Sequence, residues 1–166
     1  MGQMAQTVSD VAEDLMRVVS EAVPAFEAID EAGSLETRGS GTWSRKQILG
    51  HLIDSALNNT HRFVRAPRVE VLVFPDYDQP VWVAAGGYQD RPWPALVRFW
   101  ADLNTHLSEV IRRIPPDQLD TPCRLGESEP LTLEFLVRDY VRHMRHHLQQ
   151  ILDHEGSRGK THPPFA

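Results

Sequence analysis

The sequence predicts an all-α protein, a four-helix bundle with one long crossover connection. Two observations lead to this prediction. Apolar residues recur at gaps of three and four in four separate segments, which is the period of an amphipathic helix. Pro and Gly residues fall between those segments, where they interrupt helices. At 166 residues the chain has room for one domain around a single core, and we expect residues 1–166 to form it.

The first predicted helix runs from Val8 to about Ile29, where the apolar residues form one stripe. Pro24 lies inside this stretch and lacks the amide hydrogen that a helix needs there. We therefore expect the helix to kink or stop near Val23. Three glycines between positions 33 and 41 then indicate a loop.

The second and third helices have clear signals at their ends. Ser44 and Gln47 have the spacing of a capping box, in which each side chain bonds the other residue's backbone. The second helix follows and is stopped by Pro67, since proline disfavours helical geometry in the residue before it. The third helix opens at Pro92 and ends before Pro115.

The fourth helix runs from about Thr132 to His154 and closes at Gly156, a residue type common after helix C-termini. The predicted core therefore covers residues 8–154. The remaining tail, 155–166, is polar and contains proline, so we expect it to be flexible.

Two long connections separate the later helices. The first, residues 66–91, is of a length that is typical of a functional lid or binding loop in a compact domain. Within it, residues 69–74 are apolar enough for a short strand. The second connection, residues 115–131, shows no clear period.

Composition excludes several functional classes. The chain carries 17 Lys and Arg against 23 Asp and Glu, a net charge of −6, which argues against a nucleic-acid partner. No apolar run approaches the ~18 residues of a membrane span, and the N-terminus lacks the features of a signal peptide. The single cysteine, Cys123, cannot form an internal disulfide, and we expect it to be inert. We therefore expect a cytoplasmic protein with no membrane partner.

Histidines are the candidate functional residues, because three of the eight fall within five positions. His143 and His147 are four apart, so their rings project from one face of a helix and can converge on one ion. On a wheel of about 100° per residue, His147 lies inside the apolar arc and His143 at its margin, whereas His146 lies on the polar side. The pair supplies two ligands. A catalytic site of the zinc type needs three protein ligands and an open position.

The best third candidate is His51, on the second predicted helix. It shares a stripe with Ser55, Asn58 and Arg62, and Asp54 lies beside that stripe. The apolar residues of this helix centre about 150° away, so the wheel alone slightly favours a solvated face. The alternative is a wet cleft closed by the long connection between the second and third helices. The wheel leaves both interpretations open.

The other histidines carry weaker signals. His61 and His106 stand alone on helix surfaces, and we expect both to be solvated. His154 suits the negative end of a helix dipole, and His162 lies in the tail. The paired carboxylates around position 77 are most simply explained by turn formation.

Several short motifs together carry a resemblance to a known family. They are Trp-Ser at 43–44, GHLIDS at 50–55, Asn59, Arg-Phe at 62–63, DYDQ at 76–79 with Trp82, LTL at 131–133, and residues 140–151 with HMRHH. In this order, across about residues 8–152, the sequence resembles the DinB/YfiT-like metalloenzymes of the DinB superfamily. The resemblance implies an up-down-down-up bundle, a long crossover between helices 2 and 3, and a homodimer.

The resemblance also implies a divalent metal site. Carried over residue by residue, its ligands are His51, His143 and His147, and His146 is not one of them. Imidazole ligands suit several metals, with zinc and nickel the foremost candidates. From their positions, Asp54 or Asp139 are expected to orient a ligand ring. We expect Asn58, Arg62 and Asp78 to contact the substrate.

For activity, the resemblance implies small-molecule chemistry. Some relatives are metal-dependent transferases or isomerases that use a low-molecular-weight thiol such as bacillithiol or mycothiol, and others are named as hydrolases. An ion held by three neutral imidazoles keeps its charge and an open position for water or a thiol. We therefore expect a metal-dependent thiol S-transferase or hydrolase. The alternative is a non-catalytic dimeric bundle for stress response or small-molecule binding, in which the metal is structural or absent.

Overall fold

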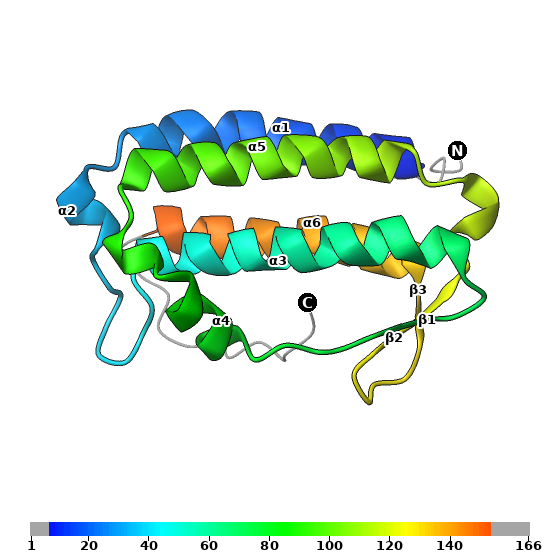
Figure 1. Ribbon diagram of the computed structural model, residues 1–166. Helices are drawn as coiled ribbons and strands as arrows, with labels where there is room; N and C mark the ends of the chain where they lie inside the picture. The colour runs from blue at the N-terminus through cyan, green and yellow to red at the C-terminus, as the bar shows by residue number, and fades with distance from the viewer. Residues whose placement is uncertain (1–6, 154–166) are drawn as a thin grey trace.

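A computed structural model describes residues 7–153. Over this range four long helices form the predicted bundle (Figure 1): α1 (Val8–Glu27), α3 (Arg45–Arg65), α5 (Trp93–Arg112) and α6 (Leu133–Leu152). α1 packs against α5 and α6, and α3 packs against the same two helices. α1 and α6 run in one direction while α3 and α5 run in the other, which gives the expected up-down-down-up arrangement.

The crossover between α3 and α5 is long because these two helices are parallel. A helix of 21 residues such as α3 is about 31 Å long, and the chain has to return along that whole length. On the way it forms η1 (Ala66–Arg68), β1 (Leu72–Phe74), α4 (Gln79–Gly86) and η2 (Tyr88–Asp90). Helix α4 was not expected from the sequence.

Local capping explains why α4 forms inside the crossover. The Asp78 side chain accepts a hydrogen bond of 3.0 Å from the backbone amide of Val81 at the helix start. At the other end Gly87 has a φ of 60°, a left-handed conformation that glycine adopts without steric cost and that ends helices. The carboxylate of Asp78, expected at the substrate, is exposed and serves as this cap.

A small sheet fastens the first half of the crossover to the bundle. β1 pairs in parallel with β2 (Pro122–Leu125), and β2 pairs antiparallel with β3 (Leu131–Thr132). The strand predicted within residues 69–74 is present at 72–74. β2 and β3 were not predicted, because such short strands leave no measurable period in the connection that follows α5.

The expected stop of the first helix near Val23 is wrong. α1 continues through Pro24 to Glu27 without a stop near Val23. Proline costs one helical hydrogen bond, but the turn after it is held by tertiary packing. Phe26 is fully buried, its ring lies 5.4 Å from that of Trp100, and its carbonyl accepts a 2.8 Å hydrogen bond from the Trp93 indole.

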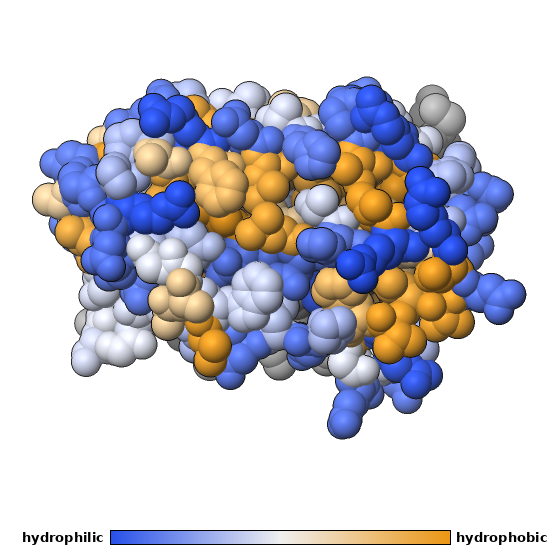
Figure 2. All heavy atoms as spheres, viewed as in Figure 1, coloured by the Kyte–Doolittle hydropathy of each residue, from blue (hydrophilic) through white to orange (hydrophobic). Residues whose placement is uncertain are grey.

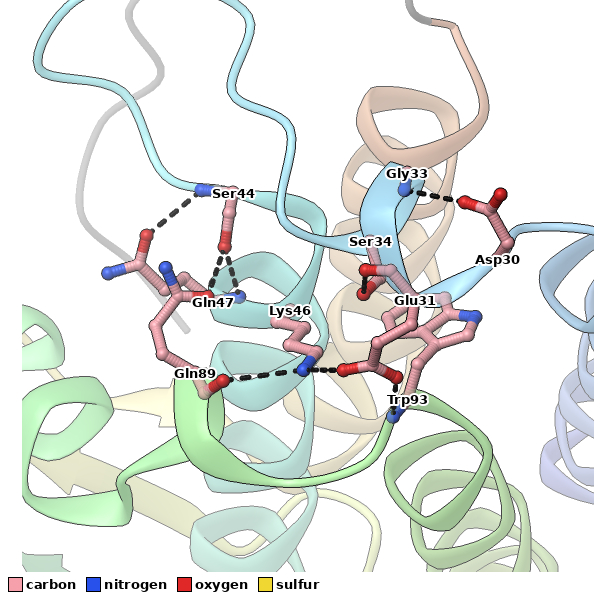
Figure 3. A network of polar contacts seen from close by, with 9 residues as sticks. All are labelled: Asp30, Glu31, Gly33, Ser34, Ser44, Lys46, Gln47, Gln89 and Trp93. Carbon is pink, nitrogen blue, oxygen red and sulfur yellow. Dashed lines mark hydrogen bonds and ion pairs between the residues drawn. The ribbon is translucent and has the colours of Figure 1, made fainter.

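The capping box at the start of α3 is confirmed, and a polar network surrounds it (Figure 3). Ser44 and Gln47 bond each other's backbones, as predicted. Lys46, which is 2% exposed, pairs with Glu31 of the short helix α2 (Glu31–Ser34), and Glu31 also accepts from the Trp93 amide at 2.9 Å. These bonds join α2, α3 and the start of α5 at one end of the bundle.

The same network fixes the end of the crossover. The Gln89 carbonyl accepts from Lys46 at 3.3 Å, and its side-chain oxygen accepts from the Ser44 hydroxyl at 2.7 Å (Figure 3). Gln89 is the middle residue of η2, so η2 is held against the first turn of α3. The neighbouring Tyr88 is thereby positioned over α3.

The fourth predicted helix ends slightly earlier than expected. α6 stops at Leu152 and Asp153 caps it. The tail 155–166, the Gly156 cap, His154 and His162 lie outside the described residues. None of the helices in the described range combines the length and apolar character needed to cross a bilayer.

The described surface carries apolar residues along the face that α3 and α5 form. Figure 2 shows hydrophobic residues gathered in a band across this face. Leu57 and Val64 of α3 and Phe99 of α5 are among the exposed large apolar residues, with Phe99 37% exposed.

Candidate metal centre

Three histidine rings converge between α3 and α6. His51 comes from α3, and His143 and His147 come from α6, one helical turn apart. The Nε2 atom of His143 lies 3.3 Å from Nε2 of His51 and 2.9 Å from Nε2 of His147. His51 is fully buried and the other two are half-buried. The solvated face that the wheel favoured for His51 is therefore wrong.

The helical wheel gave the wrong surroundings for His51 because the polar face of α3 is covered as well as its apolar face. One face packs in the bundle against α5 and α6, and the other lies under α4, η2 and β1. The polar stripe consequently becomes buried. Its buried members are His51, Asp54, Ser55, Asn58, Asn59 and Arg62. Hydrophobicity along a helix reports which face enters the apolar core, and it carries no signal for a polar face that another segment covers.

Two of the three nitrogen separations fit a metal ligand set, and all three nitrogens lie within 4.8 Å of one another. Zinc–nitrogen bonds of about 2.0–2.1 Å place two ligands about 3.3 Å apart at a tetrahedral angle and about 2.9 Å apart at a right angle. The two Nε2 distances at His143, 3.3 Å and 2.9 Å, match these values.

Gln150 sets the tautomer of one ring. Its side-chain oxygen lies 2.8 Å from Nδ1 of His147, and its side-chain nitrogen lies 2.9 Å from Nε2 of His146. With this amide orientation Nδ1 of His147 carries the hydrogen, so Nε2 presents a lone pair to the cluster. Gln150 was not among the residues predicted for the site. Its signal was the i, i+3 spacing from His147 on the same helix.

Burial keeps two of the rings neutral. It lowers the pKa of His51 to about 3, with a smaller effect from His147. It also lowers the pKa of His143 to about 2, helped by the neighbouring imidazoles and Arg142. Metal ligands must be deprotonated, so both rings are in the form that binds a cation. Trp43 packs beside His51 with 5.4 Å between ring centroids and so shields that ring from water.

The expected carboxylate partners of the rings do not form. Among the described residues, Asp139 pairs with Arg142 and makes no hydrogen bond to His143, whose buried Nδ1 has no partner. Asp54 accepts from the Tyr88 hydroxyl at 2.5 Å and does not bond His51. Asp54 bonds Tyr88 and Asp139 bonds Arg142, and the spacing of residues in the sequence could not show that these donors would be preferred to the histidines.

Tyr88 is a site residue that no sequence pattern indicated. Its ring lies against Gly50 so closely that a Cβ there would stand 2.1 Å from its Cδ2 atom, and a Cβ at Gly86 would stand 2.4 Å from its Cε2 atom. Two positions without side chains thus make room for the ring. Burial raises the pKa of Asp54 to about 6, partly offset by the Tyr88 hydrogen bond.

The other predicted contacts divide between the site and elsewhere. Asn58 donates to the Asp54 carbonyl at 2.9 Å, and Arg62 is 1% exposed, so both belong to the covered polar face of α3. His146 lies outside the three-nitrogen cluster, with its ring 5.2 Å from that of His147. Burial raises the pKa of Cys123 to about 11, so its thiol stays protonated.

The comparison with known families agrees with this architecture. The family model of the DinB superfamily matches residues 12–151. The chain belongs to the DinB superfamily. All three clustered histidines of this DinB protein lie within the matched residues.

Curated relatives of this DinB protein carry provisional names as metal-dependent hydrolases. One from Oceanobacillus iheyensis is 26% identical over a match that covers 68% of this chain and 64% of the relative, slightly less than two thirds of its length. A second from the same organism is 24% identical over 87% of this chain and 85% of the relative. One from Halalkalibacterium halodurans is 22% identical over 75% and 72% of the two chains.

A solved structure shares the fold. YfiT from Bacillus subtilis, described as a probable metal-dependent hydrolase with an unusual four-helix bundle topology, matches with a TM-score of 0.80 and 20% identity. The match covers 92% of this chain and 88% of YfiT. The predicted bundle topology of this DinB protein is confirmed.

Proposed function

We propose that this DinB protein is a metal-dependent enzyme that acts on a small molecule and holds one divalent ion through Nε2 of His51, His143 and His147. One observation carries the proposal. Three imidazole nitrogens from two helices lie within 4.8 Å of one another, and the two separations at His143, 3.3 Å and 2.9 Å, suit ligands of one ion. When bound, such an ion lowers the pKa of a water or thiol at its open position.

The residues of the chain fit supporting roles. Gln150 holds the His147 ring in the ligand tautomer. Asp54 lies one turn beyond His51 and has a buried oxygen, Oδ2, without a hydrogen-bond partner. We assign to Asp54 the acceptance of a proton from the nucleophile, because a pKa of about 6 suits a general base near neutral pH. Tyr88 orients that carboxylate.

Hydrolysis is the reaction that we favour, because the curated relatives carry names as metal-dependent hydrolases. Transfer of a low-molecular-weight thiol is the second candidate. It is supported by the ligand set itself, since three neutral imidazoles leave the ion its full charge to bind a thiolate.

Metal analysis tests the site directly. The native full-length protein, purified without chelators, is expected to contain about one zinc or nickel ion per chain. His51→Ala and His143→Ala are expected to lose it, while His61→Ala, an exposed histidine of the same helix, retains it. A native protein without stoichiometric metal, or equal loss in the His61 variant, would contradict the proposal.

Turnover then separates the reaction classes. The loaded protein is incubated with ester and amide substrates in water, and with an electrophile in the presence of several small thiols. Thiol-independent product supports hydrolysis, and product that requires a thiol supports S-transfer. If the metal only raises the unfolding midpoint and no substrate turns over, the non-catalytic alternative replaces the enzyme proposal.

A further inference from the structure

A buried arginine without an acidic partner lies on the covered face of α3. Arg62 is 1% exposed, and among the described residues it makes no ion pair. Its Nε and Nη2 atoms have no hydrogen-bond partner, and Nη1 reaches only Asn59 Oδ1 at 3.4 Å. The guanidinium lies 5.4 Å from the centre of the Phe74 ring. This ring carries no net negative charge, so it does not neutralise the arginine. A buried charge of this kind is costly unless a counter-charge completes it.

A second unused donor lies close to Arg62. The buried hydroxyl of Tyr77 lies near the Ser55 side chain without reaching hydrogen-bond geometry. The Arg62 guanidinium lies against the ring of Phe74, and Tyr77 follows Phe74 by three residues in the same segment of the crossover. The positive charge of Arg62 also lowers the pKa of Tyr77 against the larger effect of burial. Burial raises the pKa of Tyr77 to about 12, so the hydroxyl keeps its proton and can donate.

No protein group in the described range completes this pair of donors. The carboxylate whose charge acts on Arg62 is that of Asp76, which is exposed and accepts a 2.8 Å hydrogen bond from the Tyr77 amide. It forms no ion pair with Arg62. A guanidinium and a hydroxyl that both lack acceptors call for a ligand with negatively charged oxygens, since such groups match the planar donors of arginine.

The distance along α3 relates these donors to the histidines. Arg62 follows His51 by three helical turns, about 16 Å along the axis. Both side chains, with Asp54 and Ser55 between them, lie on the polar face covered by the crossover. The histidines and Arg62 therefore stand at two ends of one covered polar face, beneath the same crossover.

We propose that Arg62 and Tyr77 form an anion subsite, which binds a carboxylate or phosphate group on the substrate of this site. The assignment of the ligand as substrate rests on the proposed function. Anion binding itself does not, because it uses no atom of the three histidines.

Titration calorimetry at constant ionic strength tests the subsite, with inorganic phosphate and succinate as separate probes on the full chain. Wild type is expected to bind at least one of them saturably at one site. Arg62→Met is expected to weaken binding about tenfold or more, and Tyr77→Phe by a smaller factor. Arg65→Met is the matched control, because Arg65 is exposed on the same helix and also lies near Phe74, at 5.9 Å. It should change the affinity less than about twofold.

Two further measurements separate this proposal from a structural role and from the metal. Arg62→Met is expected to unfold at the same urea concentration as wild type or a higher one, because it removes an uncompensated buried charge. A lower midpoint, with Tyr77→Phe binding as wild type does, would make Arg62 a structural residue. His51→Ala is expected to keep anion binding. Loss of binding in that variant, no saturable binding by wild type, or an equal loss in Arg65→Met would overturn the subsite. A protein that binds no metal but keeps Arg62-dependent binding refutes only the proposed function.

Discussion

Replacing Gly50 by Ala should destabilise this protein although alanine is the better helix former. An added Cβ would stand 2.1 Å from Cδ2, 2.4 Å from Cγ and 2.7 Å from Cε2 of the Tyr88 ring. Carbon atoms pack at about 3.5–4.0 Å, so the ring has to move by about 1.5 Å. The ring has little space for this movement, because it is also packed against the backbone of Gly86. A Cβ added at Gly86 would stand only 2.4 Å from Cε2 of the ring.

The size of the effect follows from three contributions. Forcing a methyl group into packed surroundings costs about 1–3 kcal/mol. Displacing Tyr88 also loses its 2.5 Å hydrogen bond to Asp54, worth about 1.5–3 kcal/mol for a charged acceptor. The helix propensity of alanine returns about 1 kcal/mol. We expect the free energy of unfolding to fall by about 1.5–5 kcal/mol.

Urea unfolding followed by circular dichroism, on metal-free protein, measures this change. Gly39→Ala is the control, because a Cβ there meets no atom within 4 Å, and its effect should be below about 0.5 kcal/mol. In a Tyr88→Ala background the same Gly50 substitution should become neutral or stabilising by up to about 1 kcal/mol. If Gly50→Ala stabilises the wild-type chain, or costs as much without the Tyr88 ring, the reasoning is refuted.

Three other predictions concern the buried carboxylate, the ring partner and the apolar face. Burial raises the pKa of Asp54 to about 6 from 3.8, so the folded state disfavours its charge and loses stability as pH rises from about 4 to 6. Asp54→Asn should abolish that loss and raise the unfolding free energy at pH 7 by about 3 kcal/mol. Urea titrations at pH 4 and pH 7 measure this, and a variant no more stable than wild type at pH 7 would disprove the prediction. Gln150→Ala should weaken metal binding about 10–100-fold in a chelator competition, whereas Gln149→Ala, exposed on the same helix, should not. We also propose that two copies pair through the α3–α5 face, so light scattering should give twice the 18.9 kDa chain mass, and Phe99→Glu should return a monomer. A monomeric wild type would exclude the pairing.

Local patterns predicted much of the bundle and half of the site. The capping box of Ser44 and Gln47 and the four apolar periods are properties of neighbouring residues, and the structure contains them. His143 and His147 share a face because four residues make about one helical turn. Pro24 was misjudged because the packing of Phe26 against α5 outweighs a single missing hydrogen bond.

The sequence by itself determined the four long helices, the capped start of α3 and the pairing of two histidines, because each depends on residues within a few positions of one another. Residue patterns alone left the surroundings of His51 open, and only the resemblance to the DinB family grouped it with them; the tertiary structure decided that its face is buried and that Tyr88 meets Asp54. These contacts depend on how α3, α6 and the crossover pack. The helical wheel of α3 shows the same polar stripe around His51 whether that face meets water or another segment. The segments that cover the stripe, α4, η2 and β1, follow α3 in the chain, so the residues of α3 alone carry no sign of them.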